Sequence, residues 1–448
     1  MRNTNESKDA EKKGPDGFYY AVVLFCIFSF KLILIGVGES GIRADDILIL
    51  VAAFVFAVRG DFRAIPITRS VKFYLLFVGI GFASAIWNAF QGRVSLLISL
   101  FFVIRLLQYM FFYFLGYRIA AAGHTLKKAI TAYLWLMALV VPLQMVGIVP
   151  VPGNFIGITS RAVGNSNGPY ELAVIAAFML CFLGYYCKSW IKGSVSAVLV
   201  LLAASRITFA AMIVSLALTY LRKSQTRLQY AFLLLLLLVP AGIVYSLMPS
   251  GENVSGNVEL AERVSEIHLA EVPSEFSRVY SYIPTYQNSK DYYDGEFVEA
   301  TNQAETAAGD AGDISGMIRL FRWASLIKST LAHTDSIILG LGPSFGTSAV
   351  DGYYVRLFAE TGLLGLGSFL AFAYSLWLGK TGSTWPFREY AFMVFASCCF
   401  VDIGVSYKPM LLLWLWHGMQ QAKPKEESET GGTPVKLIPP LQAADAAS

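Results

Sequence analysis

Long runs of apolar residues recur along most of the chain and constrain its fold more than any other feature. A bilayer core about 30 Å thick is crossed by about 20 helical residues, so such runs predict membrane-spanning helices. Apolar residues make up 55% of the 448 positions, charged residues only 15%, and the mean hydropathy is +0.55. The sequence therefore predicts an all-α polytopic membrane protein.

Twelve candidate spans follow from these runs, nine before a long polar segment and three after it. They cover residues 18–36, 47–58, 73–90, 94–115, 129–149, 170–187, 195–204, 207–221, 230–248, 363–378, 390–405 and 410–419. The stretch 195–221 is either one long helix or two short ones, and basic clusters at both of its ends favour a hairpin with Ser205-Arg206 at the tip. The first run lacks a small-residue cleavage site, so we interpret it as an uncleaved span.

Lysine and arginine are distributed unevenly between the short loops. Those on one predicted side are basic: 2–13, 59–72, 118–128, 188–192, 222–227, 380–388 and 423–425. Those on the other side carry only Arg43, Arg93, Arg161, Arg206 and Lys408. The positive-inside rule therefore predicts that both termini are cytoplasmic.

The chain divides into five segments by composition. A cytoplasmic leader (1–17) precedes spans 1 to 9 (18–248), and a large outer loop (249–339) separates spans 9 and 10. We expect the middle of this loop to be partly mobile and an amphipathic helix near 315–331 to lie against the membrane domain. The segment 340–419 holds a glycine-rich stretch and the last three spans, and 420–448 is a disordered cytoplasmic tail by composition.

Several classes of function are disfavoured. The net charge of +4 gives no electrostatic basis for binding nucleic acid. The five cysteines lie in apolar runs and the four histidines are scattered, so we expect no metal site and no cofactor. The stretch 340–346 is rich in glycine but has neither a preceding strand nor a following Lys-Ser/Thr, which argues against a nucleotide site.

Arginines at the predicted outer boundary are candidates for binding phosphate. Arg161, Arg206, Arg319 and Arg322 all fall there, and the last two share a helix face because they are three residues apart. Guanidinium groups bind phosphate oxygens bidentately, although snorkelling and loop ion pairs are the plain alternative. Arg105 lies inside an apolar run, where an ion pair, a buried cavity and catalysis are all open.

Acidic residues near the glycine-rich stretch are the candidates for acid–base chemistry. Asp351 is either a general base or a helix N-cap. Glu360 is either that base or the partner of an arginine. Asp402 lies near the end of its run, where we expect a structural role. The glycines at 362, 365 and 367 are expected to allow close helix packing.

Four segments, in this order, resemble the O-antigen polymerase and O-antigen ligase superfamily of bacterial envelope glycosyltransferases. They are the Arg161-x-x-Gly-Asn-Ser-Asn turn, the Ser205-Arg206 tip, the arginine-bearing helix at 315–323 and the stretch 340–365. The ligases carry a histidine and one further residue, then nine residues, then Gly-x-x-Gly. Here Asp351-Gly352 is followed by nine residues and Gly362-Leu-Leu-Gly365, so aspartate replaces the histidine. Because an acidic residue here is more familiar in the polymerases, this favours a polymerase.

The resemblance implies a GT-C-like fold with about 12 transmembrane helices, acting at the periplasmic face of the bacterial inner membrane. The substrates would be oligosaccharide repeat units linked to undecaprenyl diphosphate, with a chain-length regulator and a flippase as further partners. Arg206, Arg319 and Arg322, with Arg161 or Arg105, would stabilise the leaving diphosphate, beside Ser205 at the same tip. Asp351 or Glu360 would act on the acceptor hydroxyl, and Tyr353 and Tyr354 would stack on sugar rings.

Two other functions stay open. A ligase would transfer the finished glycan to lipid A core or to protein, and it differs from a polymerase in its acceptor. A transporter or flippase of lipid-linked glycan belongs to a different class and typically has internal repeats and paired charges inside the bundle. The two halves of this sequence show no convincing repeat, and the charges gather at the outer boundary instead.

Overall fold

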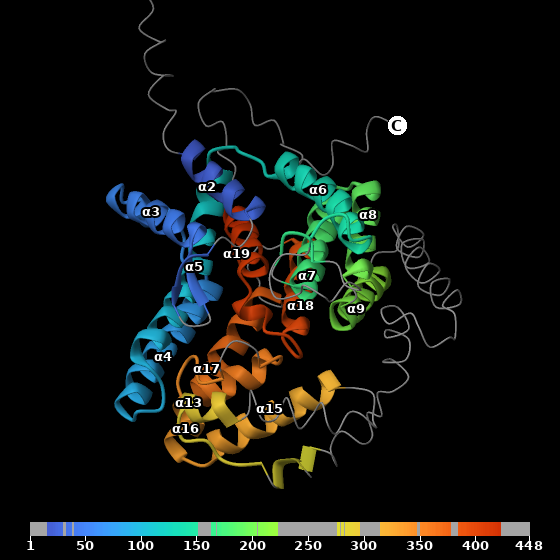
Figure 1. Ribbon diagram of the computed structural model, residues 1–448. Helices are drawn as coiled ribbons and strands as arrows, with labels where there is room; N and C mark the ends of the chain where they lie inside the picture. The colour runs from blue at the N-terminus through green and yellow to red at the C-terminus, as the bar shows by residue number, and fades with distance from the viewer. Residues whose placement is uncertain are drawn as a thin grey trace, which may run out of the picture.

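The computed structural model describes residues 16–29, 33–37, 40–150, 163–166, 168–203, 205–222, 276–277, 279–281, 283–295, 314–346, 350–377 and 384–422. This part of the chain is a bundle of helices with one short β-hairpin (Figure 1). The ninth predicted span (230–248), most of the outer loop, and the two terminal segments lie outside the described residues, apart from the ends that adjoin α2 and α19.

The helices follow the apolar runs closely in the first half of the chain. The first half contains α2 (Asp16–Phe28), α3 (Ala44–Val58), α4 (Arg69–Phe90), α5 (Leu96–Ala121), α6 (Lys127–Met145), α7 (Pro169–Met179) with a π-helical continuation (Leu180–Tyr186), α8 (Trp190–Leu202) and α9 (Arg206–Arg222). The second half contains α13 (Ser289–Tyr292), α15 (Ile314–Leu331), α16 (Thr334–Leu339), α17 (Tyr353–Trp377), α18 (Trp385–Ser397) and α19 (Tyr407–Gln421).

Five of the described helices are long and apolar enough to cross a membrane. They are α4, α5, α6, α7 with its π-helical continuation, and α17. Three shorter apolar helices, at Asp16–Phe28, Trp190–Leu202 and Ile207–Ala217, accompany them. The chain is therefore a helical membrane protein, and the stretch 195–221 forms two helices rather than one.

Glycine allows the central helices to approach closely. A Cβ atom on Gly116 of α5 would lie 2.1 Å from the carbonyl oxygen of Leu415 in α19, and one on Gly418 of α19 would lie 2.0 Å from that of Tyr113. The pair α5 and α19 thus packs backbone against backbone, as small residues permit in membranes. Beside it, α17 packs along α4 (Figure 1).

The first predicted span is wrong in its second half. Helix α2 ends at Phe28, and the chain then forms an antiparallel hairpin of β1 (Ile33–Val37) and β2 (Ser40–Arg43). The residues Ile-Leu-Ile-Gly-Val fit a strand as well as a helix, because short apolar runs do not distinguish the two. The predicted all-α class is confirmed for the described residues, which contain one small hairpin besides the helices.

Helix α17 begins earlier than predicted. The sequence predicts a span at 363–378, whereas the structure has helix from Tyr353, interrupted at Gly362 with φ +65° and ψ −166°. That backbone conformation is essentially restricted to glycine. Two helical segments therefore meet at Gly362, and much of the glycine-rich stretch is itself helical.

The loops gather at two opposite ends of the bundle. At one end, Arg118 lies 3.4 Å from Asp16 and 3.5 Å from Asp61. At the other end, the α4–α5 loop contacts α16, and α13, α15 and α16 lie together (Figure 1). Asp61 and Arg118 belong to loops of the basic set, and Arg93 belongs to a loop of the other set.

Candidate functional site

Arg319 of α15 joins two segments that are far apart in the sequence. Its Nε lies 3.7 Å from Oδ2 of Asp351, in the turn before α17. Its Nη2 donates a hydrogen bond of 3.3 Å to the hydroxyl of Tyr170, the second residue of α7. Helix α15 thereby brings a guanidinium group between the beginning of α7 and the Asp351 turn, two of the places that the sequence assigns to the outer boundary.

Asp351 has a left-handed backbone, with φ +54°. Aspartate tolerates this conformation better than most residues, although it still costs energy unless neighbours hold it. The following residue, Gly352, leaves room for Trp323 of α15, because a Cβ atom there would lie 2.6 Å from the indole Nε1. That Nε1 donates to the carbonyl oxygen of Val350 at 3.2 Å. Trp323 therefore packs against the turn that presents Asp351.

Asp351 is not the N-cap of α17. The carbonyl oxygen of Gly352 accepts from the backbone N–H of Arg356 at 2.9 Å, which makes Gly352 the residue that opens the helix. The Asp351 side chain is 33% exposed. Its partial removal from water raises its pKa above the usual range, and the charges of Arg319 and Arg322 oppose this rise. A carboxylate with a raised pKa is a better proton acceptor.

A buried ionic network lies directly behind this turn. Arg356 donates from Nε to Oε1 of Glu360 at 3.2 Å and from Nη1 to Oδ2 of Asp402 at 3.0 Å. The Asp402 carboxylate also accepts from the backbone N–H of Val350 at 3.1 Å and of Gly352 at 3.4 Å. Asp402 therefore binds the backbone on both sides of Asp351.

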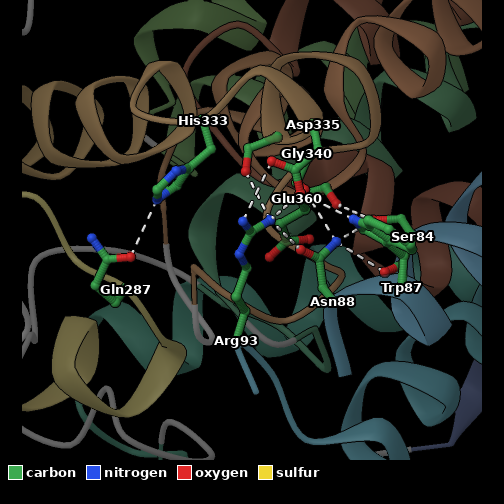
Figure 2. A network of polar contacts seen from close by, with 10 residues as sticks. Ser84, Trp87, Asn88, Arg93, Gln287, His333, Asp335, Gly340 and Glu360 are labelled. Atoms are coloured by element: carbon green, nitrogen blue, oxygen red, sulfur yellow. Dashed lines mark hydrogen bonds and ion pairs between the residues drawn. The ribbon is translucent and has the colours of Figure 1, made fainter. Parts of the chain in front are cut away.

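A second network fixes the other end of the glycine-rich stretch (Figure 2). Arg93, in the α4–α5 loop, donates to Asn88, Asp335 and Ser336 at 3.0, 2.8 and 3.0 Å. The indole of Trp87 donates to the same carboxylate at 3.0 Å. The hydrogen bonds that Asp335 accepts from Arg93 lower the pKa of Asp335 to about 2. Helix α16 is thus attached to the α4–α5 loop through the Asp335 carboxylate and the Ser336 hydroxyl.

The chain after α16 turns back against α17. Asn88 of α4 donates to the carbonyl oxygen of Gly340 at 3.1 Å, and Ser84 donates to that of Glu360 at 2.9 Å (Figure 2). The backbone N–H of Leu341 donates to Ala359 at 2.7 Å. Gly340 has φ +77° and ψ −177°, another conformation that only glycine adopts readily. This arrangement fixes the turn against the break in α17.

Several predicted site residues are buried or half-buried. Glu360 is 2% exposed and is paired with Arg356, as one of its two predicted roles required. Tyr353 is 1% exposed and packs edge-on against Phe369, so it is a core residue in this structure. Tyr354 is half-buried and donates to the carbonyl oxygen of Phe395 at 2.9 Å. The burial of Tyr353 corrects its expected stacking on a sugar ring, and the stacking of Tyr354 stays a prediction.

The remaining predicted residues are spread over several elements. Arg322 is 8% exposed and acts on Asp351 through its charge. Ser205 is buried and donates to Thr208 at 3.0 Å, and Arg206 is the first residue of α9. Arg105 pairs with Asp46 of α3 at 3.9 Å, which is the ion pair that was one of its three predicted roles. Arg161 lies outside the described residues.

Sequence reasoning missed Tyr170 and Arg356. The spacing of Arg356 and Glu360, four residues apart, is a signal for an intrahelical ion pair, but it was hidden because this segment was not assigned to a helix. Tyr170 carries no local signal, because only the folded chain brings it to Arg319. Asp402 has the structural role that was expected for it, and the structure shows what it supports.

Within the described ranges, no group of three or more His, Cys, Asp or Glu side chains is placed to hold a metal ion. The arrangement instead offers a carboxylate of raised pKa beside guanidinium groups. Comparison of the chain with family models, with curated proteins and with solved structures gave no match.

Proposed function

We propose that this protein polymerises lipid-linked oligosaccharide repeat units at the outer face of a bacterial inner membrane. The observation that carries the proposal is the Arg319–Asp351 pair, with Arg322 acting on the same carboxylate. It supplies both chemical requirements of such a transfer, cations for a leaving diphosphate and a base for an acceptor hydroxyl. The twelve-span arrangement, the GT-C-like fold and the orientation in the membrane belong to this proposal.

In the proposed reaction, the bond between the first sugar carbon and the diphosphate oxygen of one lipid-linked chain breaks. The acceptor hydroxyl of the next lipid-linked repeat forms the new glycosidic bond, and its proton passes to Asp351. The diphosphate leaves with its negative charge stabilised by Arg319, with Arg206 as a second cation and the buried Arg322 acting through its charge. A diphosphate is a good leaving group, so stabilising its charge matters more than protonating it.

Glu360 is less suited than Asp351 to act as the base. The Glu360 carboxylate is 2% exposed and bonded to Arg356, whereas the Asp351 side chain is 33% exposed. A general base must come within hydrogen-bond reach of the acceptor hydroxyl, about 3 Å. The Asp351 carboxylate meets this condition without the rearrangement of buried side chains that Glu360 would need.

The proposal is tested with purified protein in vesicles supplied with lipid-linked repeats, with product length measured by gel electrophoresis. Asp351→Ala and Arg206→Ala should each abolish long-chain polymer while the protein stays in the membrane. Arg63→Ala is the matched control, because Arg63 is an exposed arginine in the loop before α4. Normal polymer length in both variants would remove the proposed site. Product formed only when a second kind of acceptor is added would identify a ligase instead.

A further inference from the structure

The Asp351 turn is held by side chains that do not face the surface. Asp402 lies 50 residues after Gly352 in the sequence, yet its carboxylate accepts hydrogen bonds from the backbone N–H groups of both Val350 and Gly352. These two amides flank Asp351, whose backbone is left-handed. A conformation of this kind persists only where the surroundings determine it, and the Asp402 carboxylate is such a determinant.

Arg356 connects the Asp402 carboxylate to Glu360, which binds the chain at Gly346. Its guanidinium bonds to Asp402 at 3.0 Å and to Glu360 at 3.2 Å, and Glu360 in turn accepts from the backbone N–H of Gly346 at 3.3 Å. The Arg356 guanidinium therefore holds two carboxylates. Glu360 binds the chain at Gly346, and Asp402 binds it at Val350 and Gly352. The guanidinium carbon of Arg356 also lies 5.0 Å from the ring centre of Phe102 in α5.

Burial excludes Arg356 from direct contact with a substrate. Arg356 is 2% exposed, as is Glu360, and the side chain of Asp402 is 12% exposed. A buried network whose polar groups are satisfied makes its surroundings rigid and specifies one geometry. Its effect on a reaction would therefore pass through the residue it orients, which is Asp351.

We propose that Asp402 and Arg356 are positioning residues that fix the Asp351 carboxylate in the orientation needed to accept the proton of the acceptor hydroxyl. This inference rests on the proposed function. It assigns a role in the reaction to two residues that never touch the substrate, and it explains why an aspartate with a left-handed backbone stands at this turn.

The charged groups that act on Asp351 come from three regions. Arg319 and Arg322 of α15 lower its pKa, and the Asp402 charge raises it. Arg356 and Glu360 of α17 lie behind Asp402. Removing the charge of Asp402 should therefore lower the pKa of Asp351, so that the base stays deprotonated to lower pH. A purely structural defect would not move the acidic limb of the pH profile in this direction.

The test is a comparison of steady-state kinetics for wild-type protein and Asp402→Asn in vesicles with lipid-linked repeats. We expect kcat to fall about 10- to 100-fold with KM changed less than about twofold, because binding is kept while the base is misplaced. The acidic limb should also shift to lower pH. Asp402→Glu, which keeps the charge, should leave that limb in place and recover part of kcat. Arg356→Lys should lower kcat with KM kept, and it provides a second measurement if Asp402→Asn does not accumulate in the membrane.

The matched control is Asp61→Asn, which removes another carboxylate paired with arginine, at the opposite end of the bundle. Its kcat and pH profile should equal those of the wild type. If the wild type is active and Asp402→Asn shows an unchanged kcat or an unmoved acidic limb, the inference is overturned and the proposed function is not. A wild-type protein without polymerising activity would overturn the proposed function and the inference with it.

Discussion

The guanidinium group of Arg93 lies 2.8 Å from the carboxylate of Asp335, although 242 residues separate them. The pair attaches the α4–α5 loop to α16, immediately before the turn at Gly340 (Figure 2). Because Asn88 also donates to the carbonyl oxygen of Gly340, the loop and the turn are held as one unit. The geometry of the site therefore depends on contacts at some distance from Asp351.

Replacing Arg93 by alanine should destabilise this end of the protein. The change leaves the acceptors of Asn88, Asp335 and Ser336 without their shared donor, and an acceptor left unsatisfied in a buried site costs about 1–3 kcal/mol. The side chain of Asp335 is 31% exposed, so water replaces part of the loss, and we expect about 2 kcal/mol in total. Thermal unfolding in detergent measures it, and Arg63→Ala is the control. An equal melting temperature in both variants would contradict the prediction.

The same pair predicts a dependence of stability on acid pH. Hydrogen bonds from Arg93 lower the pKa of Asp335 to about 2, below its usual value of about 3.8. A carboxylate whose pKa is lowered on folding contributes stability above the unfolded pKa and loses it as the pH falls towards the folded value. The melting temperature should therefore drop between about pH 4 and pH 2. In Asp335→Asn this part of the drop should be missing, and an identical pH profile for both proteins would refute the assignment.

Gly362 should not tolerate a side chain, whereas Gly367 in the same helix should. A Cβ atom on Gly362 would lie 2.2 Å from the carbonyl oxygen of Ile338, and its backbone conformation is unfavourable for other residues. Gly367 has no atom within 4 Å of an added Cβ. We expect Gly362→Ala to cost about 2 kcal/mol or more, and Gly367→Ala to be neutral or stabilising by up to about 1 kcal/mol. Melting temperatures in detergent give the comparison, and equal losses in the two variants would contradict it.

This contrast also shows how far the sequence predicts the fold. Apolar runs predicted both ends of α4 to within four residues, and the start of α5 to within two residues and its end to within six, because length and hydropathy determine a membrane helix. They did not predict the early start of α17, since the break at Gly362 depends on its contact with Ile338. The three glycines at 362, 365 and 367 also looked equivalent in the sequence, yet a Cβ atom added to Gly367 would meet nothing within 4 Å.

The site was predictable to the extent that it depends on local chemistry. Arginines and carboxylates at one membrane boundary drew attention to Arg319 and Asp351, and the structure places them 3.7 Å apart. The partners that orient them come from distant segments. Asp402 reaches the Asp351 turn from the connection between α18 and α19, and no local pattern encodes that approach. Long-range hydrogen bonds of this kind require the folded chain.

Arg319 should not be replaceable by lysine. Its planar guanidinium group contacts the Asp351 carboxylate through Nε and the Tyr170 hydroxyl through Nη2 at the same time, whereas a lysine ammonium is a single point charge on a flexible chain. We expect Arg319→Lys to lower the rate of polymer formation by about 10- to 100-fold. Tyr170→Phe removes the acceptor of the hydrogen bond from Arg319, and one such bond is worth about 1 kcal/mol, so the rate should fall about fivefold. Rates are measured with lipid-linked repeats in vesicles at equal amounts of membrane-inserted protein. Arg63→Ala should keep the wild-type rate, and a full rate in Arg319→Lys would show that charge alone, without the geometry of the guanidinium group, is sufficient.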